Sequence, residues 1–192
     1  MLWPIVLPFK LTAVALLTLT LLATVVAAIS GRRSGRTFLI FTFVSLIAFV
    51  PVCVMITSIM DRYRFGTFQY ASFEQVDDFR VERYLPPVAR EITVNKQAQG
   101  FRAKFRIGQS ELDEYLDKAW AQYGDQSVAE RGQLPPFDSI DPELHKLLFG
   151  DLGWPPLSDA KELHGPIAGN GAGFTVWYSP KTGIAYQSGC YW

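Results

Sequence analysis

The chain has few of the residues that build disulfide scaffolds or metal sites, with two cysteines and two histidines among 192 residues. Cys53 lies inside an apolar stretch and Cys190 lies far from it in a polar segment, so we expect no internal disulfide. No two of the histidines and cysteines have the i, i+4 or Cys-x-x-Cys spacing of a specific metal site; the histidines are His145 and His164. Acids near them along the chain include Asp138, Asp141, Glu143 and Asp159. We therefore predict no metal and no cofactor.

Charge is absent from two long apolar stretches, residues 11–29 and 38–60, which only the loop 30–37 separates. Helices over these stretches, of roughly 19 and roughly 23 residues, would be about 29 and about 35 Å long, enough to cross a hydrocarbon core of about 30 Å. The sequence predicts a two-helix transmembrane hairpin over residues 1–60. The missing intramembrane charge argues against transport of ions or protons by this hairpin.

The orientation of the hairpin follows from its arginines. Short loops rich in Lys and Arg stay in the cytoplasm, and Arg32, Arg33 and Arg36 crowd the loop. We therefore expect the loop 30–37 to be cytoplasmic, with both termini and the rest of the chain outside the cytoplasm. A cleavable signal peptide is the alternative, since small residues follow the first apolar core. The absence of a basic residue from residues 1–9 argues against it.

Small residues line one side of each apolar stretch and predict where the two helices pack. Close backbone approach through small side chains stabilises helix contacts in lipid, where apolar burial alone gives little gain. We expect the remaining surface of each helix to contact membrane lipid. The predicted packing residues are Thr20, Ala23, Thr24, Ala27 and Ala28 in the first helix, and Thr42, Ser45 and Ala48 in the second.

The polar part of the chain, after residue 60, has no excess of basic residues. Residues 1–60 carry four basic residues and no acid, so all 18 acids lie after residue 60. That part lacks the electrostatic footprint of a nucleic-acid-binding protein, and its length suits about one domain. We expect an interfacial segment and a stalk helix within residues 61–90, the helix at 73–84, and an extracytoplasmic α+β domain over 91–192.

Alternation of apolar residues with a period of two predicts four strands in this domain. They lie at 92–94, 101–107, 174–178 and 184–190. Between the two pairs, a helix opens at Ser110 with acids in its first turn and ends at Gly124. The sequence predicts a small antiparallel sheet in the order ββα-loop-ββ, backed by this helix.

Residues 84–92 read Tyr-Leu-Pro-Pro-Val-Ala-Arg-Glu-Ile, and they precede the strand 100–107 and the helix start 110–116. This succession of a Leu-Pro-Pro-x-Ala-x-x-Ile entry, a Phe-containing strand and a capped helix resembles a module of uncharacterised bacterial membrane-anchored and lipoprotein ectodomains. The resemblance implies this fold and a location in the bacterial inner membrane. It implies no activity and no site residue.

The connection over residues 125–172 is longer than most loops, which indicates a purpose. Within it, Asp141, Pro142 and Gly150 mark the cap, the start and the end of a short helix. We predict that exposed apolar residues of this connection contact a partner protein. The predicted partner surface consists of Phe149, Trp154 and Leu157.

A basic stripe is predicted on one face of the second strand, since alternate residues of a strand share a face. It consists of Arg102, Lys104 and Arg106. Such a stripe suits an anionic headgroup, an acidic partner or a polyanionic polymer. A solvated sheet face beside acidic neighbours is the other interpretation.

Nucleophile motifs are also missing, because no serine has a nucleophile-elbow context and no Ser, His and acid are placed as a triad. We therefore predict a non-catalytic interaction or assembly protein, an accessory subunit of a larger membrane complex. Its partners would be membrane lipid and either another membrane protein or a second copy of itself. The alternative is an extracytoplasmic ligand sensor whose connection closes as a lid over a pocket, and a hydrolase is the remaining possibility.

Overall fold

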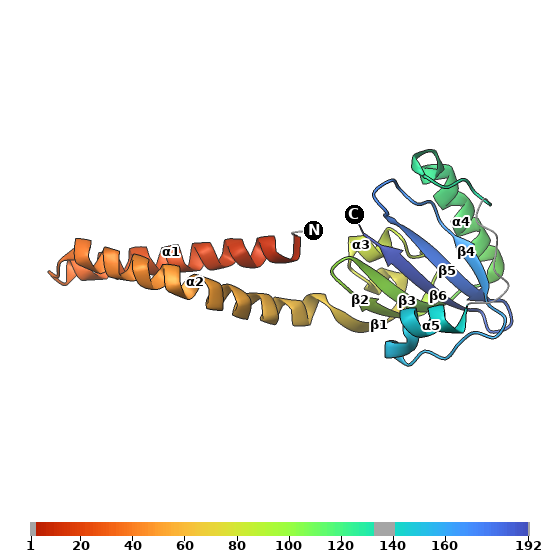
Figure 1. The fold of residues 1–192 in the computed structure, drawn as a ribbon, viewed down its shortest axis with the longest axis horizontal. Coiled ribbons are helices and arrows are strands. Elements are labelled where there is room, and N and C mark those ends of the chain that lie inside the picture. The colour runs from red at the N-terminus through yellow and green to blue at the C-terminus, as the bar shows by residue number, and fades with distance from the viewer. Residues whose placement is uncertain (1–2, 133–140, 192) are drawn as a thin grey trace. The chain divides into compact units, whose positions relative to one another are not determined.

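The computed structural model describes residues 3–132 and 141–191. The chain divides into two units, Met1–Arg64 and Phe65–Trp192 (Figure 1). Each unit is described by itself below.

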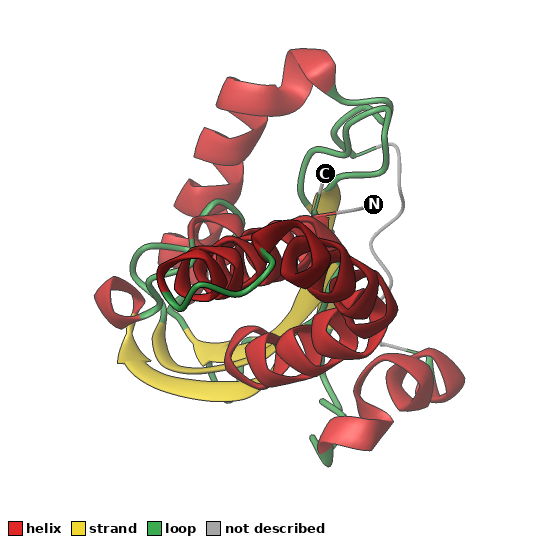
Figure 2. Cartoon of the chain, turned by 90° about the vertical axis from the view of Figure 1, so that its left-hand side faces the viewer, coloured by secondary structure: helices red, strands yellow, loops and turns green. Residues whose placement is uncertain are grey.

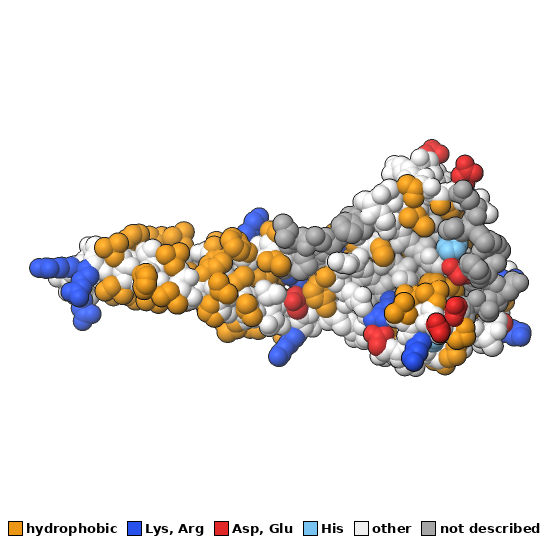
Figure 3. Space-filling view, viewed as in Figure 1, with side chains coloured by type: hydrophobic (Ala, Val, Ile, Leu, Met, Phe, Trp, Pro, Cys, Tyr) orange, Lys and Arg blue, Asp and Glu red, His pale blue; other side chains and the backbone are white. Residues whose placement is uncertain are grey.

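The N-terminal unit is a pair of long apolar helices, α1 (Trp3–Ile29) and α2 (Ser34–Arg64). By length and composition, both are able to cross a membrane. Hydrophobic side chains cover the face of this unit shown in Figure 3, and basic side chains gather at its loop. Helix α2 begins inside the predicted loop, so the observed connection between the helices is shorter than expected.

A pair of hydroxyl groups joins the two helices. Thr20 Oγ1 lies 3.1 Å from Ser45 Oγ, and Thr20 also donates to the carbonyl oxygen of Leu16 at 2.9 Å. Thr20 and Ala27 are buried within the unit. The other residues of the predicted packing faces that are partly buried are Ala23, Thr24, Thr42, Ser45 and Ala48, whereas Ala28 is exposed.

The C-terminal unit is built on one six-stranded antiparallel sheet (Figure 1). Its strand order is β1-β2-β3-β6-β5-β4. The strands are β1 (Gly66–Ser72), β2 (Arg90–Lys96), β3 (Gly100–Arg106), β4 (Lys161–His164), β5 (Gly173–Ser179) and β6 (Ile184–Cys190). The four predicted strands correspond to β2, β3, β5 and β6. The two edge strands, β1 and β4, were not predicted.

Among the described residues of this unit, three α-helices and three short 3-10 turns accompany the sheet. The helices are α3 (Phe79–Glu82), α4 (Gln109–Tyr123) and α5 (Pro142–Phe149), and the turns are η1 (Phe73–Gln75), η2 (Gly124–Gln126) and η3 (Gly150–Leu152). Helix α4 begins one residue before the predicted Ser110, and the Glu111 side chain accepts from the Gly108 backbone N–H at 2.9 Å. Helix α5 has the predicted bounds, with Asp141 accepting from the Glu143 N–H.

The prediction of a stalk helix at 73–84 is wrong, whereas the interfacial location of the segment after residue 60 stays a prediction. Helix α2 continues to Arg64, and β1 follows after Phe65 alone. Phe68 and Tyr70 then pair with Val94 and Ile92 of β2. The apolar residues within 73–84 belong to a 3-10 turn and to the four-residue α3. A continuous helix is interrupted at Asp77, because its φ is +43°.

The sheet is covered on both faces, because alternate residues of its central strands feed two separate cores. Figures 1 and 2 show α4 and α5 on opposite sides of the sheet. The core beside α3 and α4 includes Leu85, Ile92, Phe101, Phe105, Leu112 and Val176. The core beside α5 consists of Phe149, Trp154, Leu157, Ala160, Trp177 and Tyr186.

The two middle strands, β3 and β6, approach each other where each carries a glycine. A Cβ atom on Gly100 would lie 2.2 Å from the carbonyl oxygen of Gly189, and one on Gly189 would lie 2.4 Å from the ring of Phe101. Phe101 is 2% exposed and stacks on Tyr191, with ring centroids 5.8 Å apart. The Phe101 ring therefore fills the space that a side chain at residue 189 would need.

Replacing Gly189 with alanine should lower the free energy of unfolding by about 1–3 kcal/mol, because the new methyl group overpacks a closed core. The measurement is urea unfolding of the detergent-solubilised full chain, followed by tryptophan fluorescence. Gly169→Ala is the matched control, since its Cβ would meet only Val128 at 3.6 Å, an ordinary contact. Equal stability of the two variants would contradict the proposed packing constraint.

Candidate functional site

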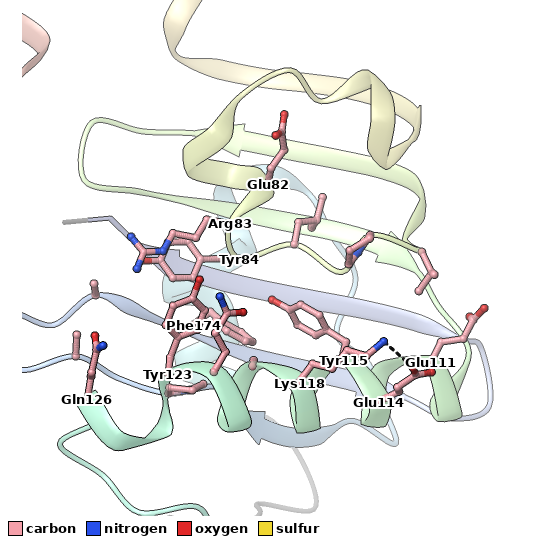
Figure 4. A pocket seen from close by; sticks show the side chains of 18 residues that line it. Glu82, Arg83, Tyr84, Glu111, Glu114, Tyr115, Lys118, Tyr123, Gln126 and Phe174 are labelled. Atoms are coloured by element: carbon pink, nitrogen blue, oxygen red, sulfur yellow. Dashed lines mark hydrogen bonds and ion pairs between the residues drawn. The ribbon is translucent and has the colours of Figure 1, made fainter.

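A groove of about 410 Å³ lies between the segment 82–88 and helix α4 (Figure 4). Its third wall comes from residues 166–174, which lead into β5. Aromatic and aliphatic side chains dominate its lining, with a few charged groups at the margin. Lining residues with aromatic or charged side chains are Glu82, Arg83, Tyr84, Glu111, Glu114, Tyr115, Lys118, Tyr123 and Phe174.

Phe174 forms the aromatic floor of this groove. Its ring centroid lies 6.1 Å from that of Tyr84 and 5.7 Å from that of Tyr115. A Cβ atom on Gly165 would lie 2.3 Å from the Phe174 ring, so the glycine leaves room for it. Gln187, fully buried on β6, donates through Nε2 to the carbonyl oxygen of Tyr84. These contacts fix Phe174 and Tyr84 to the sheet.

The charged groups around the groove already have partners inside the domain. The Arg83 guanidinium lies 5.5 Å from the ring centroid of Tyr84 and 5.4 Å from that of Tyr123, a cation–π arrangement (Figure 4). Lys118 lies 2.6 Å from a Glu114 carboxylate oxygen. Glu82 accepts from the Asp78 backbone N–H at 2.8 Å, as Glu111 does from Gly108. The margin is thus pre-organised and mildly acidic.

The Tyr115 hydroxyl of the groove is buried and has no hydrogen-bond partner among the described residues. Its side chain extends from α4 toward the sheet (Figure 4). Burial raises the pKa of Tyr115, and the nearby Tyr123 and Tyr84 raise it further. The hydroxyl therefore stays protonated, as a neutral group able to donate a hydrogen bond. Burial also raises the pKa of Tyr84.

An ion-pair network supports the segment that forms the first wall. Lys96 is 9% exposed, faces the rings of Phe68 and Tyr70, and lies 3.2 Å from Asp78 Oδ2. Asp78 caps α3 by accepting from the Arg80 N–H at 3.2 Å and lies 3.3 Å from Arg80 Nε. The network ties the start of α3, and with it the segment that follows, to β2.

The predicted partner surface is not a surface, so that prediction is wrong. Phe149 is fully buried, and Trp154 and Leu157 are each 9% exposed. The ring of Phe149 lies 5.6 Å from those of Trp154 and Trp177, and Tyr186 donates to the Pro155 carbonyl oxygen at 2.7 Å. These residues bury the second face of the sheet, which Trp177 and Tyr186 make apolar.

The basic stripe lies on that same face of β3, and two of its three members are engaged. Arg102 donates to the Leu148 carbonyl oxygen at 2.5 Å and to both carboxylate oxygens of Asp151 at 2.6 and 2.9 Å. Arg106 pairs with Glu91 at 2.7 Å. Arg102 thus fastens α5 and η3 to the sheet, and Lys104 is partly buried beside it.

The two histidines lie in different environments. His145 is buried against the rings of Phe149 and Tyr186, and burial lowers the pKa of His145. His164 Nε2 lies 3.3 Å from Glu162 Oε1 on the edge strand β4. Within residues 3–132 and 141–191, no group of three or more His, Cys, Asp or Glu side chains is placed to hold a metal. Asp138 lies outside the described residues.

Both cysteines are free thiols. Cys190 is exposed at the end of β6, and Cys53 is partly buried in α2.

Comparison with known protein families, with curated proteins and with solved structures finds no match for this chain. The resemblance to bacterial ectodomain modules therefore stays a prediction from the residues. The function is argued below from the geometry of the chain itself.

The sequence does not predict the groove. Tyr115 and Tyr123 recur on one face of α4, a pattern that predicts core packing. Tyr84 lies at the end of the predicted helix 73–84, which the structure does not contain. One sequence feature could have indicated the groove. Bulky aromatic residues lie at the margin of the apolar face of α4, beside the buried Leu112 and Leu116.

Asp78 should make stability depend on pH in acid. Burial raises the pKa of its carboxyl, but Lys96 and then Arg80 outweigh this effect and hold the pKa below 3.8. Stabilisation from the ionised group is thus fully present above pH 3.8 and is lost as pH falls through the folded-state pKa. Asp78→Asn should lower the free energy of unfolding at pH 7 by about 3 kcal/mol and flatten its decline in acid.

The measurement is urea unfolding of the full chain across pH 2–7. Asp117→Asn is the matched control, because the Asp117–Arg131 pair has side chains 62% and 57% exposed. Such a surface pair contributes little stability, about 0–1 kcal/mol. An Asp78→Asn variant with the same pH profile as the unmodified chain would contradict the role given to the network.

Proposed function

We propose that this protein is a non-catalytic, membrane-anchored binding protein whose groove holds a partner protein within a larger membrane complex. The hairpin of α1 and α2 anchors the chain, and the α+β domain supplies the contact. The observation that carries the proposal is the aromatic groove between the segment 82–88 and α4.

The groove has the size and composition of a binding site. Ligand pockets usually measure about 300–1,000 Å³ and combine apolar walls with a few fixed polar groups. This groove falls within that range and offers three tyrosines, one phenylalanine and the stacked Arg83. Its charged groups are held by internal partners, and such fixed charges suit recognition better than proton transfer, which needs an acid or base free to exchange.

The arrangement in the membrane is part of the same proposal. We place the chain in the inner membrane of a bacterium, with the loop 30–37 in the cytoplasm and both termini and the domain outside. The density of arginine in that loop supports this orientation. Only Phe65 separates the end of α2 from the start of β1 in the sequence.

A ligand sensor is the second candidate, and the buried Tyr115 hydroxyl favours it. A ligand that accepts a hydrogen bond there would relieve the cost of an unpaired buried group. The expected lid, however, is not formed by residues 141–160, because they pack as the core beneath the second sheet face. A sensor would therefore bind its ligand in a groove that is open at the margin of α4.

Val88→Asp should disrupt the proposed complex. Val88 lines the groove and is 44% exposed, so the substitution adds charge to an apolar wall with little effect on folding. We expect association to weaken at least tenfold, about 1.4 kcal/mol. The measurement is the native size of the chain and the recovery of its partner after extraction in a gentle detergent.

Leu147→Asp is the matched control for this experiment, since Leu147 is 77% exposed on α5 and lies outside the groove. It should leave the complex intact. A complex that survives Val88→Asp, or that both variants disrupt equally, would refute the groove as the contact. A chain that is monomeric after extraction but gains thermal stability from a small molecule would favour the sensor.

The proposed orientation predicts the labelling of the two thiols. A membrane-impermeant maleimide applied to intact cells should label the exposed Cys190 and spare Cys53, which the bilayer shields. The measurement is the mass of the labelled chain, compared with Cys190→Ser as control. Labelling of Cys190 only after lysis would reverse the orientation.

A further inference from the structure

The two edges of the sheet differ in a way that bears on assembly. Edge strands in monomeric proteins are usually short, charged, bulged or interrupted by proline, since their free backbone groups can pair with another chain. The β4 edge follows this rule, with four residues that include Lys161, Glu162 and His164. The β1 edge has seven residues, no charged side chain and no proline.

The backbone groups of β1 that point away from the sheet belong to alternate residues. The Ala71 N–H donates to Gln75 Oε1 at 2.9 Å, so Ala71 faces outward. Because backbone groups alternate in an antiparallel strand, Thr67 and Gln69 direct theirs to the same side. Among the described residues, β1 has a partner strand on one side only.

We propose that β1 of one copy pairs antiparallel with β1 of a second copy, joining two sheets into one. The two-fold axis passes beside Phe68, so that Thr67 lies opposite Gln69 of the partner subunit, and Gln69 opposite the partner's Thr67. This register uses both outward-facing residues in two hydrogen-bonded pairs. A register centred on Gln69 would need the Ala71 N–H, which Gln75 occupies.

The side chains around this edge suit a self-complementary contact. Phe68 would lie beside the partner's Phe68 as a non-hydrogen-bonded aromatic pair, an arrangement that stabilises sheets. Lys96 lies 5.1 Å from the Phe68 ring centroid, but Asp78 at 3.2 Å balances its charge. Two copies therefore do not bring two uncompensated Lys96 charges together at this edge.

A second copy is the occupant that the chain itself supplies. Every copy has the same uncharged edge, and only Phe65 separates it from a helix long and apolar enough to cross a membrane. Confinement to one bilayer raises the effective concentration of such edges for each other. The inference does not depend on the groove, which lies between α4 and the segment 82–88.

Cysteine cross-linking tests the register. In the full chain with Cys53→Ser and Cys190→Ser, reconstituted in lipid bilayers, Phe68→Cys should form a disulfide-linked dimer on mild oxidation. Opposed Cα atoms of a non-hydrogen-bonded pair lie about 4.5 Å apart, within disulfide range. Mixed Thr67→Cys and Gln69→Cys chains should cross-link more than either chain alone. Lys161→Cys, on the other edge, is the control and should form no disulfide-linked dimer.

A second variant tests the edge without a disulfide. Gln69→Pro removes an outward N–H and leaves the hydrogen bonds to β2 in place, a position where edge strands tolerate proline. Light scattering of the full chain in detergent should show a dimer for the unmodified chain and for Gln69→Ala, and a monomer for Gln69→Pro.

Three results would overturn this inference. They are a monomeric unmodified chain in lipid bilayers, a Gln69→Pro chain that stays dimeric, and cross-linking at Lys161→Cys in place of Phe68→Cys. If Gln69→Pro fails to fold, as its melting temperature would show, the cross-linking register decides the question.

Discussion

The pairing of β3 with β6 is the interaction on which the domain depends. It runs without interruption from Gly100↔Cys190 to Arg106↔Ile184 and joins the N-terminal strands to the C-terminal ones. Alternate residues of the pair enter opposite cores, with Phe101 and Gln187 on the side of α4 and Tyr186 on the side of α5. Gln187 of β6 donates to the Tyr84 carbonyl oxygen, so this strand pair also positions the groove wall that contains Tyr84. A shift of one residue would exchange the two faces and destroy both cores.

Much of the fold could be predicted, and the failures have a physical cause. The long apolar helices, the capped α4 and α5 and the four inner strands follow from local periodicity and capping residues. The edge strands do not follow from these local signals. Strand β4 has only four residues, and the aromatic residues of β1 come directly after a long apolar helix, where aromatic residues are typical of a membrane interface. The predicted stalk helix fails at Asp77. Its positive φ interrupts the helix, and such a φ is unusual for a residue with a side chain.

The candidate site was harder to predict, because burial is a property of the whole fold. Trp154 and Leu157 sit among prolines in a long connection, as exposed contact residues often do. They become core only because Trp177 and Tyr186 make the second sheet face apolar. The groove itself comes from three segments that the sequence keeps far apart. No spacing rule connects Tyr84, Tyr115 and Phe174, which meet through the sheet.

The strand order has a consequence for biosynthesis. The two long helices leave the ribosome before β1, β2 and β3 do. One edge of β3 stays unpaired, and its apolar residues stay uncovered, until β5 and β6 have been synthesised. Those later strands complete the middle of the sheet, because β6 pairs with both β3 and β5. Such long-range pairing folds slowly and exposes sticky intermediates. A chaperone would be needed most during this interval.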